Sequence, residues 1–331
     1  MSDDQLPFVA EVGTGDSNPH VNANDSLQNA EWLLGLLNLK GVGNKKALKL
    51  AQHFGTFQKL SSASESEVAK IVGLKSFQLE NLARVDAEQP DDVKIMTYFD
   101  PSYPSGLRNL QDPPPVLWYR GKIPKQKSFA IVGTRNADDW GRNTTRLLAK
   151  MCGERGIVVV SGLALGIDTE AHKGCLETST PTVAILACDV RYPSPKTNSK
   201  LGEEILEKGG CLIAEVPPGS QTESFALVAR NRMQAAWSEG LIVTQCGIPS
   251  GTLHTARFAL ELGRKLIVLE PPLQANGSQY EGNWNLVQDY KFDSRILGGT
   301  KKFQESVQGR TRGADIVLKS LSEFEEFLKN A

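Results

Sequence analysis

The sequence predicts an α/β protein in which a doubly wound, mostly parallel sheet follows a small helical domain. Short β-branched apolar runs alternate with helix-length amphipathic stretches from residue 129 onward. Continuously apolar strands of this kind are buried on both faces, as in parallel sheets covered by helices. Residues 27–84, in contrast, carry apolar side chains at helical spacing. A chain of 331 residues and 36.1 kDa also exceeds what one core usually holds, so we expect two folded domains.

The composition excludes several classes of protein. Lys and Arg total 37 against 38 Asp and Glu, so any anion-binding surface must come from local segregation of charge. No apolar run approaches the roughly 18 residues of a membrane span, and the N-terminus lacks a secretory signal. The five cysteines are scattered and form no metal-binding spacing. These features predict a cytoplasmic protein without a membrane segment, disulfide framework or metal site.

The first 26 residues differ from the rest of the chain. They contain five acidic residues and neither lysine nor arginine, with Gly, Asn, Ser and Pro throughout. Such a segment cannot bury enough apolar area to offset its ordering entropy. We therefore expect a disordered acidic leader over residues 1–26.

The next segment, residues 27–90, is predicted to be a helical domain. Two helical stretches flank Gly41-Val42-Gly43, which Lys45 and Lys46 follow, and this is the helix-hairpin-helix arrangement. From Leu36 to Arg84 eight basic residues face three acidic ones, a local net charge of +5. Small glycines let backbone amides approach a DNA phosphate, and lysines add charge. Gly41, Gly43, Lys45 and Lys46 are therefore a candidate secondary DNA site. A degenerate second hairpin is expected at residues 71–75, and a module serving protein contacts alone is the alternative.

A Pro-rich connector is expected over residues 91–124, because three consecutive prolines follow Asp112. The second domain then spans 125–331, with an irregular insertion near 272–312. Its expected strands cover 129–133, 157–162, 182–188, 211–216, 240–246 and 265–271. Its expected helices fall near 141–155, 168–177, 198–208, 230–238 and 251–263. The runs GADIVLKS and LSEFEEFLK predict a last strand and a last helix.

The carboxyl ends of the first two strands carry groups suited to an anion, and ligands of doubly wound sheets bind at these ends. Gly133 and Arg135 follow the first strand, and the second is followed by a loop with Ser161, Gly162, Gly166 and Asp168. A glycine pair before a helix offers free backbone N–H groups, and Arg135 adds a forked donor. In the alternative interpretation the glycines only permit a tight turn, and Asp168 is favoured as a helix cap over a catalytic group. His172 is more commonly a structural hydrogen-bonding residue than an acid or base.

Two further loops carry similar groups. Arg230-Asn231-Arg232 stands at the expected start of a helix, and Ser250-Gly251-Thr252 precedes the next one. Convergence of these loops on one rim predicts a phosphate site made of Gly133, Arg135, Ser161, Gly162, Gly166, Asp168, Arg230, Asn231, Arg232, Ser250, Gly251 and Thr252. The sequence shows neither GxGxxG nor a P-loop, and no nucleophile–base or paired-carboxylate motif. We therefore predict a binding protein that uses no cofactor and is not an enzyme.

Several blocks in order resemble the DNA-processing protein A (DprA/Smf) family of single-stranded DNA binders. The blocks are Tyr103-Pro104, Asp112 to Leu117, Tyr119-Arg120-Gly121, Val132 to Arg135, Ser161 to Ala164, Gly166 to Asp168, Ala171-His172, Tyr192-Pro193, Pro217 to Gly219, Arg230 to Arg232 and Ser250 to Leu253. The match covers about residues 30–271.

The resemblance implies a Rossmann-like domain behind a SAM-like helical module, a homodimer, and single-stranded DNA in the basic pocket at the strand ends. It also implies protection of incoming strands during natural transformation and their delivery to a RecA-type recombinase. The alternative is a Rossmann-like sensor or processing enzyme for a small nucleotide. A third hypothesis is a defence or stress component that uses the same pocket.

Overall fold

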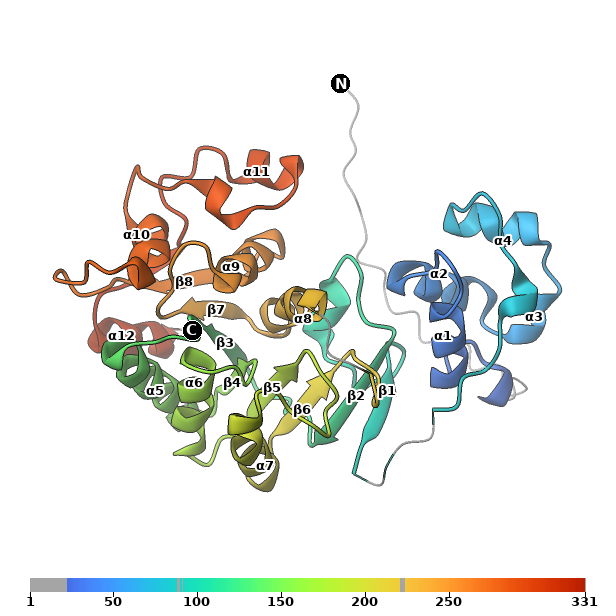
Figure 1. Cartoon of the computed structure of the whole chain (residues 1–331), viewed down its shortest axis with the longest axis horizontal. Helices are drawn as coiled ribbons and strands as arrows, with labels where there is room; N and C mark the ends of the chain where they lie inside the picture. Colours follow the sequence, from blue (N-terminus) through green and yellow to red (C-terminus); the bar gives the residue numbers. More distant parts are fainter. Residues whose placement is uncertain (1–22, 88–89, 91, 221–223, 331) are drawn as a thin grey trace. The chain divides into compact units, whose positions relative to one another are not determined.

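The computed structural model describes residues 23–87, 90, 92–220 and 224–330 (Figure 1). The chain forms two compact units, one of residues up to 42 with 46–85 and one of 43–45 with 86–331. Of the acidic leader predicted over 1–26, residues 1–22 lie outside the described residues. Within the described ranges no helix has the length and apolar character needed to cross a membrane.

The first unit is helical. Its helices are α1 (Ala30–Leu37), α2 (Asn44–Phe54), α3 (Phe57–Ser61) and α4 (Glu65–Val72). Side-chain caps start α1 and α4, where Asn29 accepts a hydrogen bond from Glu31 N and Ser64 accepts one from Glu67 N. Gly73 ends α4 in the left-handed conformation that favours glycine (φ 64°). Beyond residues 71–75, where the second hairpin is predicted, the described residues form a 3-10 turn, Leu79–Asn81.

The second unit contains a mixed sheet. Its strands are β1 (Lys94–Thr97), β2 (Val116–Gly121), β3 (Ser128–Val132), β4 (Val158–Ser161), β5 (Thr182–Leu186), β6 (Cys211–Ala214), β7 (Gly240–Val243), β8 (Lys265–Leu269) and β9 (Ile316–Leu318). The described strands pair in the order β1-β2-β6-β5-β4-β3-β7-β8-β9 (Figure 1). Pairs β1–β2 and β2–β6 are antiparallel and the others are parallel. The predicted mostly parallel, doubly wound sheet is therefore confirmed.

The strand order places a topological switch at β3. The chain winds outward from β3 through β4 and β5 to β6, then returns to β7 on the other side of β3. From β7 it continues outward to β8 and β9. Neighbouring strands β3 and β7 therefore lead into loops that diverge, which leaves a crevice at their carboxyl ends.

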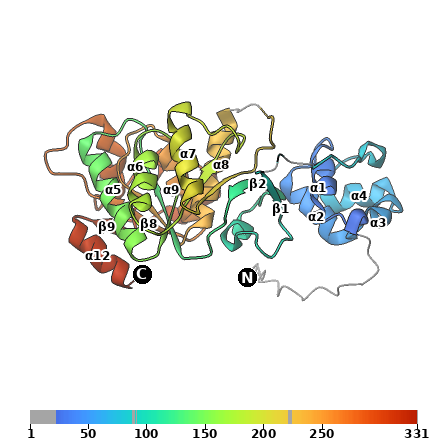
Figure 2. The same ribbon diagram turned by 90° about the horizontal axis from the view of Figure 1, so that it is seen from below.

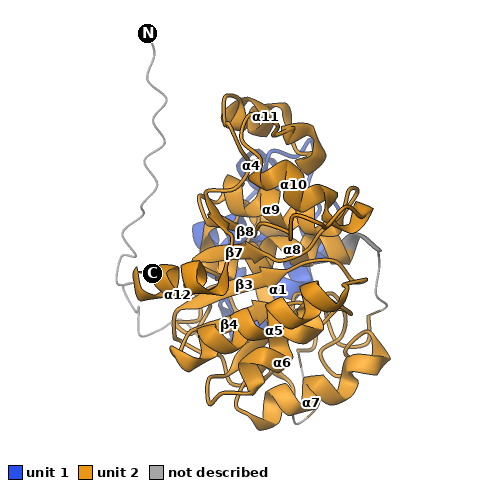
Figure 3. Cartoon of the chain, turned by 90° about the vertical axis from the view of Figure 1, so that its left-hand side faces the viewer, with its two compact units in different colours: residues 1–42, 46–85 blue, residues 43–45, 86–331 orange. Residues whose placement is uncertain are grey.

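Helices cover both faces of the sheet (Figures 2 and 3). They are α5 (Asp139–Glu154), α6 (Ile167–Leu176), α7 (Ser199–Glu207), α8 (Ser224–Trp237), α9 (Gly251–Glu261), α10 (Glu281–Val287), α11 (Lys301–Val307) and α12 (Leu321–Asn330). Helices α5, α6 and α12 pack on one face, and α8, α9 and α10 pack on the other. Helix α8 contacts β3, β4 and β5, so it crosses the sheet close to the switch.

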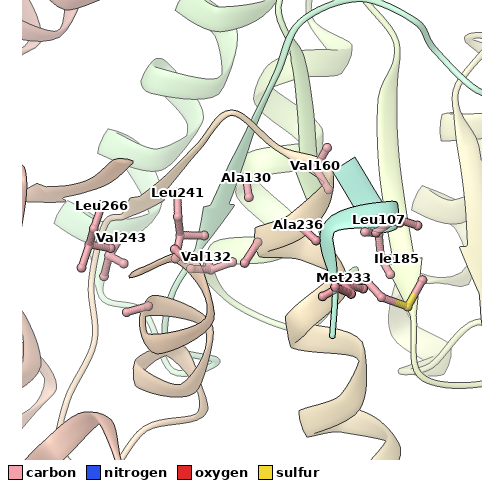
Figure 4. Close-up of a cluster of buried hydrophobic side chains, with 14 of the residues drawn as sticks. Leu107, Ala130, Val132, Val160, Ile185, Met233, Ala236, Leu241, Val243 and Leu266 are labelled. Atoms are coloured by element: carbon pink, nitrogen blue, oxygen red, sulfur yellow. The ribbon is translucent and has the colours of Figure 1, made fainter. Parts of the chain in front are cut away.

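The core between α8 and the sheet is close-packed. Val132, Ile185 and Leu241 on the strands meet Met233 and Ala236 on α8 (Figure 4). All five side chains are fully or almost fully buried. Alternation along each strand sends intervening residues to the opposite face, where α5 and α6 cover them. This packing holds α8 against the sheet beside strand β3, where the winding reverses.

Three segments differ from their predicted form. The connector predicted over 91–124 contributes the unpredicted strand β1 to the sheet edge, where Met96 is buried, whereas β2 coincides with the short strand expected from the run VLWYRG. The insertion near 272–312 contains α10 and α11, and their apolar side chains pack on the core. Helix α8 begins at Ser224 instead of near residue 230, so Arg230 lies within the helix.

Candidate anion-binding cleft at the strand ends

A cleft of about 520 Å³ opens at the carboxyl ends of β3 and β7, where the winding of the sheet reverses. Its lining comes from the loops after β3, β4 and β7 and from one side of α8 and α9. Eight of the predicted residues line it, namely Gly133, Arg135, Asp168, Arg230, Asn231, Ser250, Gly251 and Thr252. The volume lies within the range of sites for small ligands, so it can hold one nucleotide unit.

Two glycines allow the loops to approach each other. A Cβ on Gly133 would lie 2.4 Å from the Ile167 side chain and 2.7 Å from the Gln245 carbonyl oxygen. Gly166 has φ +73°, and a Cβ there would lie 2.4 Å from the Thr134 carbonyl oxygen. Both positions therefore require glycine for packing. Gly166 itself does not line the cleft, but its conformation brings α6 against the loop that carries Arg135.

Gly162 makes room for two buried charges. A Cβ on Gly162 would lie 1.6 Å from Arg230 Nη1 and 2.7 Å from Asp168 Oδ2. The Arg230 side chain donates a hydrogen bond to the Ile185 carbonyl oxygen (2.8 Å), and the residue is only 6% exposed. Burial lowers the pKa of Arg230, with the nearby positive charge of Arg135 acting in the same direction and Asp168 opposing it. The guanidinium is thus held at the floor of the cleft with an open Arg135 close by.

Asp168 is not the helix cap that the sequence favours. Helix α6 starts after Gly166, which occupies the N-cap position, so Asp168 lies in the first turn. Its Oδ2 accepts hydrogen bonds from Gly162 N (3.1 Å) and Ala164 N (3.4 Å), and the residue is 5% exposed. Burial raises the pKa of the carboxyl, opposed mainly by the Arg230 charge. Asp168 therefore orders the β4–α6 loop and balances Arg230.

The three residues Arg230-Asn231-Arg232 do not all point into the cleft, because they lie on different sides of α8. Arg230 and Asn231 line the cleft, and Asn231 Nδ2 donates to the Gly251 carbonyl oxygen (3.3 Å). Arg232, two positions on, points elsewhere because neighbours at that spacing lie on different sides of a helix. Its guanidinium pairs with Glu215 (2.6 Å) and Asp112 (3.5 Å). Its prediction as a phosphate ligand is therefore corrected to a buried anchor.

The β7–α9 loop adds the positive end of a helix. Ser250 caps α9 and accepts a hydrogen bond from Thr252 N (3.2 Å). Gly251 is exposed, and a Cβ there would meet nothing within 4 Å, so its backbone borders open space. The helix dipole and the first N–H groups at this rim favour an anion.

Ser161 at the end of β4 and His172 on α6 have structural roles. The Ser161 hydroxyl donates to the Ile131 carbonyl oxygen (2.7 Å) and is fully buried, so it links β4 to β3 instead of lining the cleft. His172 is also fully buried, with Nδ1 2.9 Å from Thr182 Oγ1. Burial lowers the pKa of His172 to about 3, so the imidazole is neutral and outside the cleft.

Sequence reasoning missed Gln234 and His254, which both line the cleft. Gln234 is 2% exposed, and its Nε2 has no hydrogen-bond partner among the described residues; the same holds for His254 Nδ1. Gln234 follows Arg230 by four positions, the spacing that shares one helix face. The helix expected near 230–238 already contained both residues, so this spacing was the signal that could have identified Gln234. Across the described residues, no group of three or more His, Cys, Asp or Glu could hold a metal ion.

The predicted secondary site lies in the hairpin between α1 and α2. Gly41 adopts φ +80°, and Lys46 Nζ donates to its carbonyl oxygen (2.9 Å). Gly43 and Lys45 are exposed on this hairpin. Of the two predicted lysines, Lys46 therefore contacts the hairpin backbone, whereas Lys45 does not make this contact.

Comparison with known proteins identifies both parts. Residues 94–296 match the family described as DNA recombination-mediator protein A. The chain belongs to this DprA/Smf family. Residues 33–89 match the SAM-like helix-hairpin-helix tandem, which confirms the predicted module. Protein Smf of Synechocystis is 31% identical over 276 residues, covering 78% of this chain and 68% of that protein. DNA processing protein DprA of Bacillus subtilis is 35% identical over 170 residues, covering 50% and 57%.

Solved structures of DprA proteins share the fold. DprA from Streptococcus pneumoniae aligns with a TM-score of 0.67 at 23% identity, covering 89% of this chain and 96% of that one. A structure of DprA from Helicobacter pylori, described for its single-stranded DNA binding mode, aligns with a TM-score of 0.55 at 23% identity and covers 72% and 96%.

Proposed function

We propose that this DprA/Smf family member binds single-stranded DNA through its backbone phosphates in the cleft at the strand ends. The chemistry of the cleft supports the proposal. Arg135 and Arg230 bring two guanidiniums to one side, and α9 directs its N-terminus to the other. Asp168 is the acidic side chain in the lining, and it is already engaged by the backbone of its own loop. The balance of charge favours a phosphate.

The single observation that carries the proposal is the placement of these groups at the switch between β3 and β7. Ligands of doubly wound sheets bind there because the loops diverge. Arginine can hold a phosphate with two hydrogen bonds, and a helix N-terminus adds backbone donors. Backbone contacts carry little sequence information, so the proposed binding is largely independent of sequence.

We also propose that the hairpin of the helical module is a second DNA contact. Its residues 40–46 combine exposed glycine backbone with three lysines, and backbone amides and lysines are typical phosphate ligands. This contact would add affinity without replacing the cleft.

Family membership supports further, finer proposals. We propose that the protein is a cytoplasmic homodimer that delivers the bound strand to a RecA-type recombinase during DNA uptake and recombination, and that it acts by binding instead of catalysis. Analytical ultracentrifugation tests the dimer. Delivery is tested by a RecA strand-exchange assay on strands precoated by a single-strand binding protein. If adding this protein does not shorten the lag before strand exchange begins, delivery is contradicted.

The test of the ligand class is a side-by-side titration of a single-stranded oligonucleotide, the matching duplex and free mononucleotides at several salt concentrations. We expect the single strand to bind best, with log K falling linearly as log salt rises because counterions are released. Tight, salt-insensitive binding of one mononucleotide would instead identify a nucleotide sensor and overturn the proposal.

A further inference from the structure

A second basic cavity lies at the amino ends of the strands, opposite the cleft at their carboxyl ends; we call this side of the sheet its amino-terminal edge. The cavity measures about 490 Å³ and is lined by residues that directly precede three neighbouring strands and by the uncharged segment 101–106. Lys125 to Lys127 precede β3, Ser238 and Glu239 precede β7, and Arg264 precedes β8. The order β3-β7-β8 makes these three amino ends adjacent, so segments distant in sequence meet here.

Positive charge dominates this cavity. Lys125, Lys127 and Arg264 line it together with one acid, Glu239. Glu239 pairs with Lys127 (2.9 Å), whereas Lys125 and Arg264 form no ion pair with any described residue. Two cations therefore converge on the cavity without a counter-charge from the described part of the chain. Since like charges repel, such an arrangement stabilises a bound anion.

Two buried polar atoms in the lining also have no partner among the described residues. Ser238 is 1% exposed, and its hydroxyl forms no hydrogen bond. Arg264 donates from Nη2 to the Ala236 carbonyl oxygen (3.0 Å), but its buried Nε has no acceptor. Buried donors are nearly always satisfied, so an acceptor in the cavity is the simplest completion.

We infer that this amino-terminal edge is a second anion site that takes a phosphate group. A phosphate offers the oxygen acceptors that the Arg264 fork and the Ser238 hydroxyl lack, and its charge matches Lys125 and Arg264. The phosphate belongs either to a small phosphate compound or to a distant part of a bound nucleic-acid strand. The site lies at the strand ends opposite the cleft, so it stands independently of the proposed function.

The experiment titrates inorganic pyrophosphate into the full chain while backbone amide shifts are followed by NMR. The cleft is first filled with a single-stranded oligonucleotide of about six nucleotides, a length within the usual range of one binding site. We expect shifts at Ser238 and Arg264 that saturate, and a dissociation constant at least tenfold weaker in Arg264→Gln. Lys125→Gln, an exposed position that leaves the fold intact, should weaken binding in the same direction.

Lys301→Gln is the matched control, because it removes one charge from a side chain that is 91% exposed on α11. It should leave pyrophosphate binding unchanged. The inference is overturned if the parent protein shows no saturable shift at this edge, or if the arginine and lysine variants bind pyrophosphate like the parent. If the short oligonucleotide itself fails to bind, the proposed function is contradicted while the pyrophosphate titration still reports this edge.

A final arm distinguishes the two sources of phosphate. If a long strand reaches this edge, Arg264→Gln weakens binding of an oligonucleotide of about 40 nucleotides but not of the short one, since it removes a phosphate contact. If the phosphate comes from a small compound, both lengths bind the variant like the parent, and only the pyrophosphate affinity falls. Either dependence on oligonucleotide length, together with a lower pyrophosphate affinity of Arg264→Gln, supports the site.

Discussion

Gly162→Ala tests how the floor of the cleft is built. The added methyl carbon would lie 1.6 Å from Arg230 Nη1 and 2.3 Å from its Cζ. Carbon contacts need about 3.5 Å, so the guanidinium has to move by roughly 2 Å. That movement breaks its 2.8 Å hydrogen bond to the Ile185 carbonyl oxygen. A lost hydrogen bond to a charged group costs about 1.5–3 kcal/mol, and overpacking costs a further 1–3 kcal/mol.

We therefore expect Gly162→Ala to lower the free energy of unfolding by roughly 2.5–6 kcal/mol and to lower Tm by about 5–24 °C. Single-strand affinity should fall as well, because Arg230 leaves the cleft. Gly251→Ala is the matched control for stability, since a Cβ there meets nothing within 4 Å. Thermal and urea denaturation followed by circular dichroism measure both variants. A Gly162→Ala protein that melts within about 1 °C of the parent would refute the packing described for Arg230.

Three further outcomes follow from the described contacts. Arg232→Ala leaves Glu215 buried without its partner, so urea denaturation should show a loss of about 3–5 kcal/mol while the folded protein binds DNA like the parent. Burial lowers the pKa of His172 from 6.5 to about 3, so its contribution to stability is complete above pH 6.5 and is lost as the pH falls towards 3. Denaturation across this range should show a slope of up to about 1.4 kcal/mol per pH unit that His172→Gln reduces. Lys45→Ala should lower the salt dependence of DNA binding, whereas Lys59→Ala, an exposed change on α3, should not; equal slopes would assign the hairpin to protein contacts.

The sequence predicted the sheet well because its strands are short apolar runs buried on both faces. Every residue of β3, β4 and β5 is buried, and short continuous apolar, β-branched runs mark such segments. Edge strand β1 was missed, since its four residues include one buried side chain and follow a polar stretch. Helices α10 and α11, of seven residues each, are too short to show a clear helical period within a polar insertion.

The loops of the site were predicted in place, but the roles of single side chains were not. Asp168 looked like a cap because it stands near a helix start, while the true cap, Gly166, has no side chain to signal it. Arg232 lacks acidic residues nearby in sequence, yet Glu215 and Asp112 approach it from β6 and the connector. Such pairings depend on tertiary packing, which local patterns do not encode. Gln234 lay within the expected helix, four positions after Arg230, but its uncharged side chain did not mark it as an anion-binding group.

The most direct test of the central claim compares Arg135→Ala with Arg295→Ala in a single-strand titration at low salt. Arg135 is exposed in the lining of the cleft, and Arg295 is a control arginine that is 87% exposed outside that lining. If the cleft binds phosphate, Arg135→Ala weakens single-strand affinity at least tenfold, or about 1.4 kcal/mol, without lowering Tm. Arg295→Ala then binds like the parent. An Arg135→Ala protein that binds single strands as tightly as the parent would contradict the assignment of the cleft as the DNA site.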